Sequence, residues 1–287
     1  MINDYSKNVF NYFNVDRFVE TGTYMGETPS TILDWGFAGK IDITEIKQEY
    51  CQTSTAINLL KILGFWNLRH EYDTRYSAHA EIERSAMFQA QIHPEFTVPL
   101  PAGQPALPWQ KGFTNQVTEI VFALGAAILQ EQEHWNFYSL AKKAGIDLPK
   151  LDKYNIFKSD TRDFLNDYTV AHDSKNTFFY LDAHWDADDY PLLEELKILA
   201  NISHLNPIIA IDDFKTPGTN HGFDVYKEKV CEAPLIEDIV KEVTDTIYCC
   251  PRANFHNRGQ AFVFYNRNKK DVQPLLDRYP LIEIPIK

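Results

Sequence analysis

The stretch RFVETGTYMGETPSTILDWGF at residues 17–37, followed by KIDITEI at residues 40–46, decides the fold of this chain. An apolar run ends at Glu20, a glycine-containing turn follows, and Pro29 suits the first turn of the helix expected next. The second run alternates isoleucines and ends at Glu45. This order of strand, helix and strand is typical of a sheet with parallel strands and helices packed against it.

The same rhythm resumes after residue 150, with strands expected in KYNIFKSD (153–160), NTFFYLDAHW (176–185) and NPIIAIDDF (206–214). Residues 245–267 read as two strands joined by the polar turn HNRG, and we expect this pair to form the antiparallel edge of an otherwise parallel sheet. Between the two halves, about residues 65–135 contain a proline-rich extended loop and an amphipathic helix. The pattern predicts one doubly wound, Rossmann-like α/β domain over residues 1–287, with a largely helical insertion at about 65–135.

Composition narrows the classes of partner. The chain has 287 residues, 28 Lys and Arg against 40 Asp and Glu, and a formal net charge of −12 without any basic block, which argues against a nucleic-acid partner. It lacks an apolar window long enough for a membrane span and the features of a signal peptide, and its four cysteines show no metal-binding spacing. A cytoplasmic location is therefore expected, with no membrane partner.

Acidic residues end the expected strands: Glu20, Glu45, Asp160, Asp182 and the pair Asp212 and Asp213. Ligands of open parallel sheets bind at these carboxyl ends. The turn after Glu20 carries Gly22 and Gly26, which permit a tight turn and close approach of a ligand to the backbone, but it is neither a dinucleotide fingerprint nor a P-loop. Glu45 is placed to accept the ribose hydroxyls of a nucleoside, or is simply an exposed strand-end glutamate.

Three of these acids suggest a metal. Asp182 ends one strand, and Asp212 and Asp213 end another 30 residues on. Neighbouring parallel strands bring such ends close together, and three carboxylates suit Mg²⁺ or another hard divalent cation. The alternative is a solvated acidic rim.

Taken together, the segments FVETGTYMGET, ITEI, FKSDTRDFL, FFYLDAHWDADDYPLLEELKIL and PIIAIDDF resemble the class I S-adenosylmethionine-dependent methyltransferases, most closely the metal-dependent sugar O-methyltransferases of the macrocin and TylF type. The resemblance covers residues 15–50 and 150–266. It implies a seven-stranded sheet with its last strand antiparallel. It also implies that Glu20, Gly22 and Gly26 hold the methionine part of the cofactor, Glu45 its ribose and Asp160 its adenine edge. The same cofactor site would include Thr23, Thr28, Ser159 and Asp182. The metal site implied by the resemblance binds Mg²⁺ through Asp182, Asp212 and Asp213.

The implied reaction is methyl transfer to a hydroxyl of a small polyhydroxylated or sugar-containing molecule, with the metal and Asp182 positioning that hydroxyl. Members of the family often carry a second aspartate two residues after the first, where this chain has His184. His184 is then a candidate general base, a metal ligand or a structural histidine. His221 is a weaker candidate, and Lys215 is expected to compensate nearby negative charge.

The insertion is expected to serve as a lid, a homo-oligomer contact or an acceptor pocket. Its aromatic side chains suit a ring-shaped acceptor or ordinary core packing: Phe96, Trp109, Phe113 and Trp135. Two rival functions stay open. A metal-dependent nucleotide-sugar glycosyltransferase is suggested by Asp-Ala-Asp at residues 186–188, and a non-catalytic α/β module would bind a partner through the insertion.

Overall fold

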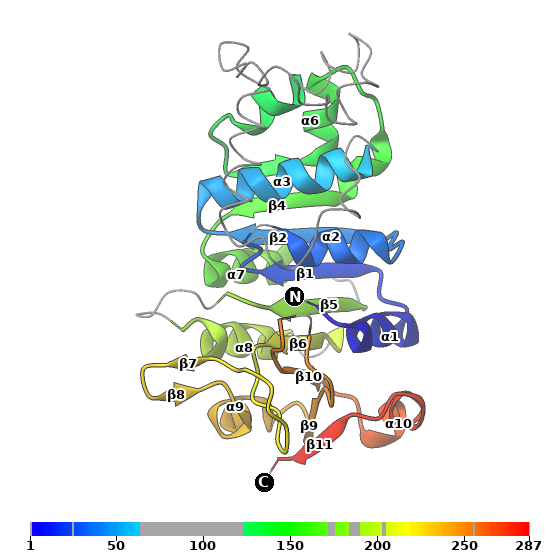
Figure 1. Ribbon diagram of the computed structural model, residues 1–287, viewed down its shortest axis with the longest axis vertical. Coiled ribbons are helices and arrows are strands. Elements are labelled where there is room, and N and C mark those ends of the chain that lie inside the picture. Colours follow the sequence, from blue (N-terminus) through cyan, green and yellow to red (C-terminus); the bar gives the residue numbers. More distant parts are fainter. Residues whose placement is uncertain are drawn as a thin grey trace, which may run out of the picture.

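A mixed sheet with a largely parallel centre extends along the length of the molecule, and helices pack against it (Figure 1). The computed structural model describes residues 2–24, 26–63, 123–171, 176–183, 190–202, 205–254 and 256–286. The α/β class expected from the sequence is confirmed in this coarse form. None of the described helices combines the length and apolar character required to cross a membrane.

Nine strands form the sheet in the described ranges, in the spatial order β11-β9-β10-β6-β5-β1-β2-β4-β3. Their bounds are β1 Arg17–Thr21, β2 Lys40–Glu45, β3 His134–Asn136, β4 Tyr154–Lys158, β5 Thr177–Leu181, β6 Ile208–Asp212, β9 Thr246–Cys249, β10 Gln260–Phe264 and β11 Ile282–Pro285. The strands β4, β2, β1, β5 and β6 are mutually parallel. A separate hairpin pairs β7, Val225–Tyr226, with β8, Lys229–Val230.

The edges of the sheet differ from the expectation. β10 pairs antiparallel with β6 and with β9, so it lies inside the sheet and not at its border. The short strands β11 and β3 form the two edges, antiparallel to β9 and β4. The sequence indicated neither edge strand, because β3 is only three residues long and the apolar residues of β11 are interrupted by charge and end in proline.

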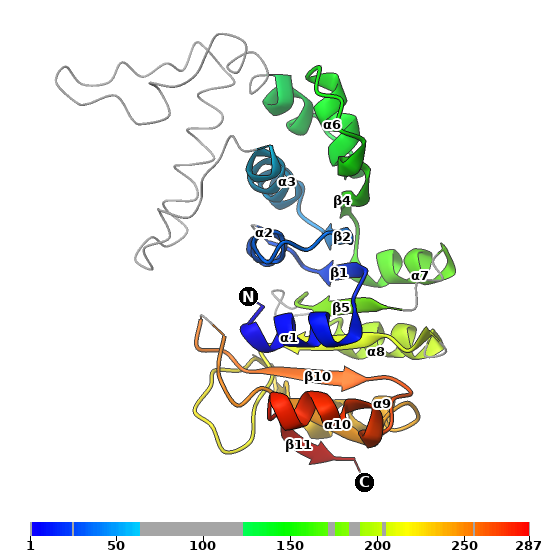
Figure 2. The ribbon, with the colours of Figure 1, turned by 90° about the vertical axis from the view of Figure 1, so that its right-hand side faces the viewer.

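Helices cover both faces of the sheet (Figure 2). Their bounds are α1 Asp4–Phe13, α2 Glu27–Asp34, α3 Gln48–Ile62, α6 Phe137–Lys143, α7 Thr161–Ala171, α8 Leu192–Asn201, α9 Ala233–Val240 and α10 Lys269–Arg278, with a 3₁₀ turn at Pro149–Lys153. Side chains from α1, α2, α3, α6 and α10 share one hydrophobic core, and those from α7, α8 and α9 share the other. Successive strand residues alternate between the cores, as Phe178 and Phe179 do, which is why β5 and β6 read as nearly continuous apolar runs.

The insertion falls mainly on residues 64–122, which lie outside the described residues together with Phe96, Trp109 and Phe113. The chain is helical at 123–128 and enters the sheet at β3, within the range predicted to be inserted. Trp135 is fully buried there, and its indole N–H donates to the carbonyl of Ile128 at 3.0 Å. Of the four aromatic residues considered for an acceptor pocket, Trp135 therefore belongs to the core.

Candidate functional site

The strand order reverses between β1 and β5. From β1 the chain builds outward through β2 and β4, and it then returns to place β5 and β6 on the other side of β1. The carboxyl ends at such a reversal form the crevice in which open α/β sheets bind ligands. Thr21 pairs with Leu181 and Leu181 with Ile211, so Gly22, Asp182 and Asp212 follow at the next position of three neighbouring strands. The structure thus brings these three positions together at one edge of the sheet.

The glycine turn is tightly packed. Gly22 has φ +73°, and a Cβ there would lie 2.7 Å from Cα of Ala183. Its N–H donates to the Thr44 carbonyl at 3.0 Å, which ties the turn to β2. Gly26 has φ +80° where α2 begins, and a Cβ there would lie 2.3 Å from Oγ of Ser54. Both positions therefore require glycine, for conformation and for space.

Glu20 is a buried carboxyl at the end of β1, with 1% of its surface exposed. Burial raises its pKa to about 8, because removal from water disfavours the charged form, and the Thr23 and Thr28 hydroxyls nearby lower it only in part. Within the described ranges, neither carboxyl oxygen has a partner in hydrogen-bonding geometry, and the buried Thr23 hydroxyl also lacks one. Asp212 lies close enough to raise the pKa further. The site therefore contains a buried carboxyl whose hydrogen-bonding capacity is not used within the described ranges, and a nearby positive charge would favour its ionised form.

Glu45 is also buried, at the end of β2. Its two carboxylate oxygens accept the backbone N–H groups of Tyr24 and Lys47, each at 3.0 Å. Burial raises the pKa of this carboxyl, and the two backbone donors lower it in part. Each oxygen keeps a further lone pair, so the carboxylate retains the capacity to accept hydroxyl hydrogens. The alternative of an exposed strand-end glutamate is excluded.

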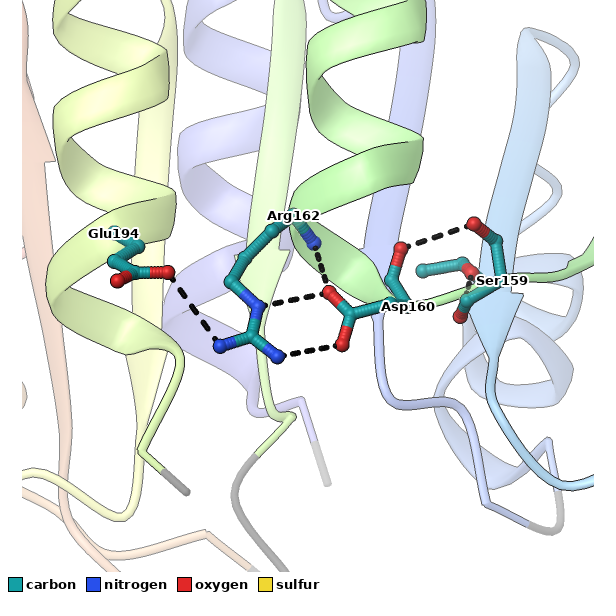
Figure 3. Close-up of polar contacts among 5 residues, drawn as sticks. Ser159, Asp160, Arg162 and Glu194 are labelled. Carbon is teal, nitrogen blue, oxygen red and sulfur yellow. Dashed lines mark hydrogen bonds and ion pairs between the residues drawn. The ribbon is translucent and has the colours of Figure 1, made fainter.

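The loop after β4 places Ser159 and Asp160 beside the start of α7 (Figure 3). The Asp160 carboxylate accepts from the backbone N–H of Arg162 at 2.9 Å and from its guanidinium at 2.9 and 2.7 Å. These bonds hold the pKa of Asp160 below its ordinary value. Arg162 also lies 3.4 Å from the carboxylate of Glu194 on α8. An adenine contact at Asp160 would therefore have to share oxygens that already accept from Arg162.

The three acids predicted to bind metal are not arranged as a metal-binding group in the described part of the chain. Asp182 and Asp212 follow neighbouring strands, and Asp212 is 2% exposed and accepts from the Asn254 amide at 3.3 Å. Asp213 has φ +53°, and its carboxylate accepts from Nε of Arg258 at 2.6 Å. Among the residues that the structure describes, no group of three or more His, Cys, Asp or Glu side chains is arranged to hold a metal ion. The residues present do not fit a three-carboxylate magnesium site.

The loop between β9 and β10 contains site residues that the sequence reasoning missed. Asn254 reaches Asp212, Arg258 reaches Asp213, and Nε2 of His256 lies 3.4 Å from Glu27 in the first turn of α2. The signal in the sequence was the alternation of polar side chains in Asn-Phe-His-Asn-Arg, residues 254–258. It was read only as a turn, although it precedes a strand that lies beside β6.

Two other expectations concern single residues. His184 lies outside the described residues, so its candidate role as a base stays a prediction. His221 is partly buried, and its Nδ1 atom has no hydrogen-bond partner in the portion of the chain described. Lys215 compensates nearby negative charge, as expected, through an ion pair with Glu232, whose carboxylate lies 2.7 Å from its Nζ atom.

A search of protein families found no family model that matches the chain, and a search of curated proteins found no match either. The chemistry of the site therefore has to be inferred from its own residues. These residues supply a buried carboxyl whose oxygens have no hydrogen-bond partner among the described residues, a glycine turn in close contact with the neighbouring strand end, and a second buried carboxylate with spare acceptor capacity.

Proposed function

We propose that the chain is an S-adenosylmethionine-dependent O-methyltransferase that acts on a hydroxyl of a small polyhydroxylated or sugar-containing molecule. The observation that carries the proposal is Glu20, whose carboxyl oxygens are buried at the strand-order reversal and lack a hydrogen-bond partner in the described structure. The amino-acid part of the cofactor carries an ammonium group, which would satisfy such a carboxyl. Its ionised form would then be stabilised by an opposite charge.

The surrounding residues support the same ligand. Gly22 and Gly26 let the turn beside Glu20 pack closely against the end of β5 and against α3. Glu45, one strand further on, has the capacity to accept two hydroxyl hydrogens, as a ribose would require. Thr23 and Thr28 add hydroxyl groups beside Glu20, and the backbone carbonyl of Asp182 packs against Gly22 across the reversal.

The arrangement of strands also supports this family. The seven inner strands, β4-β2-β1-β5-β6-β10-β9, contain a single strand that runs antiparallel to its neighbours, and that strand, β10, is the last of the seven in the chain. This agrees with the seven-stranded, doubly wound sheet that the resemblance implies. β3 and β11 then count as additions at its edges.

Bound S-adenosylmethionine would supply an electrophilic methyl group. The contribution of the protein is to hold the cofactor through Glu20, Glu45 and the glycine turn, and to orient an acceptor hydroxyl in line with that methyl group. Asp182 and Asp212 lie at adjacent strand ends, where they can accept hydrogen bonds from the acceptor. We assign no step to Mg²⁺, because Asp213 is paired with Arg258. His184 stays the proposed acceptor of the hydroxyl proton.

Calorimetric titration with S-adenosylhomocysteine tests the proposal without knowledge of the acceptor. We expect 1:1 binding to the wild type, and no detectable binding of UDP-glucose with Mg²⁺, the ligand of the rival glycosyltransferase. Glu20→Gln should weaken S-adenosylhomocysteine binding at least roughly tenfold, because the variant loses a charge-assisted contact. Glu228→Gln, at an exposed glutamate remote in sequence from the site, is the control. If well-folded protein bound UDP-glucose and not S-adenosylhomocysteine, the proposal would be wrong.

A further inference from the structure

Arg258 is the cation at the acidic end of β6. Its Nε atom donates to Asp213 at 2.6 Å, and its Nη2 atom forms an ion pair with Asp224. All three side chains are largely buried, with 29%, 13% and 22% of their surfaces exposed. A planar guanidinium presents several donors in fixed directions, so a single arginine can hold two carboxylates that would otherwise repel each other.

The backbone also turns Asp213 toward this partner. Asp213 adopts the left-handed conformation, with φ +53°, immediately after Asp212 ends β6. The carbonyl of Asp213 accepts the N–H of Asp224 at 3.0 Å, and the second carboxylate oxygen of Asp224 accepts from the Tyr226 hydroxyl at 2.6 Å. Asp213 is therefore linked to Arg258 and Asp224, and through Asp224 to Tyr226.

The backbone of the β9–β10 loop holds Arg258 in place. The side-chain oxygen of Asn254 accepts the N–H groups of His256 and Arg258 at 3.0 and 2.9 Å. Gly222 forms a bridge with Arg258, and a Cβ at Gly222 would lie 3.0 Å from Cδ of Arg258. Arg258 is thus held by backbone contacts with Asn254 and Gly222 in addition to the ion pairs of its guanidinium. These contacts distinguish it from a mobile arginine on the surface.

We propose that Arg258 is a built-in cation of this cluster, which joins Asp213 to Asp224 and keeps Asp213 out of any metal site. A divalent ion bound by Asp213 would have to displace the Arg258 guanidinium, which is already hydrogen-bonded to that carboxylate. Arg258 would then lose this hydrogen bond and lie beside a second positive charge, which would repel it. Asp182 and Asp212 lie at the neighbouring ends of β5 and β6.

Binding of Mn²⁺, measured from the loss of the free-ion electron paramagnetic resonance signal, tests this assignment in the whole chain without cofactor or acceptor. We expect Asp213→Asn to leave Mn²⁺ binding within about twofold of the wild type, whether the wild type binds weakly or not at all. Arg258→Gln should strengthen Mn²⁺ binding roughly tenfold or more, because it frees two neighbouring carboxylates from an internal cation. The double variant Arg258→Gln/Asp213→Asn should lose this gain.

Arg252→Gln, which removes an exposed arginine of the same loop, is the matched control and should leave Mn²⁺ binding unchanged. Arg258→Gln should also lower the melting temperature, by roughly 5 °C or more, and added Mn²⁺ should restore part of the loss. A purely structural arginine would not produce this metal-dependent recovery. Weaker Mn²⁺ binding in Asp213→Asn than in the wild type would overturn the proposal, and this comparison stands even if Arg258→Gln does not fold. Failure of S-adenosylhomocysteine to bind would leave the proposal untouched.

Discussion

Replacing Glu20 with glutamine should change how stability depends on pH. The pKa of Glu20 is raised from 4.5 to about 8 by burial, so the folded protein keeps this proton in a range where the unfolded chain has lost it. A raised carboxyl pKa contributes stability at low pH, and this contribution is lost as the pH rises through the folded pKa. Glutamine resembles the protonated side chain in shape and does not ionise. The wild type should therefore lose stability relative to Glu20→Gln as the pH increases.

The size of the effect follows from proton linkage. Between pH 4.5 and 8 the wild type should lose about 1.4 kcal/mol per pH unit relative to the variant. At pH 7, about 2.5 units above the ordinary glutamate pKa, the accumulated difference is about 3 kcal/mol. Glu20 is 1% exposed, so solvent screening does not reduce this value much.

Urea denaturation at intervals between pH 5 and 8 measures the difference in unfolding free energy between the two proteins. Titrations common to both cancel in that difference, and Glu228→Gln controls for removal of one exposed carboxylate. A difference constant within about 0.5 kcal/mol over this range would refute the reasoning, because Glu20 would then ionise as it does in the unfolded chain. Binding of S-adenosylhomocysteine at pH 7 should release close to one proton, seen as a dependence of the binding enthalpy on the buffer.

Three further predictions concern single residues. Gly22→Ala should cost about 2 kcal/mol or more of unfolding free energy, because the position has φ +73° and the new Cβ would lie 2.7 Å from Cα of Ala183. Gly36 has φ +77° but open space around it, so Gly36→Ala should cost only about 1 kcal/mol. Equal losses for the two variants in urea denaturation would contradict the steric clash at Gly22. Glu45→Gln should weaken S-adenosylhomocysteine binding, measured by calorimetry, roughly tenfold, and it should leave the binding of methionine, which lacks the ribose, unchanged. Equal losses for both ligands would contradict a ribose contact at Glu45. Arg162→Gln should raise the pKa of Asp160 toward 3.8. In the wild type the lowered pKa stabilises the folded state at neutral pH, and this contribution is lost as the pH falls through the folded pKa; the variant should lack it already at neutral pH. A carboxyl-carbon NMR titration that shows no upward shift of the Asp160 pKa would contradict the ion pair.

Local sequence was sufficient to identify the inner strands and the acids that end them. A buried strand can be recognised in the sequence as a run of apolar residues bounded by turn residues such as glycine. The carboxyl end of the strand lies where that apolar run stops. This is why Glu20, Glu45, Asp182 and Asp212 lie at the carboxyl ends of β1, β2, β5 and β6, as the sequence predicts, with Gly22 directly after β1. It is also why the α/β class could be predicted.

Tertiary structure alone decided which side chains compensate those acids. Asp213 and Arg258 are 45 positions apart, and they meet because β10 inserts beside β6 and returns its preceding loop over the strand ends. No pattern within either segment carries that pairing, since it depends on the order of strands in the sheet. The burial that raises the pKa of Glu20 is likewise a property of the packed helices and strands around it. The sequence by itself thus determined where charge lies along the chain, and the fold determined whether that charge is paired, buried or left for a ligand, because desolvation and ion pairing depend on distances that only packing sets.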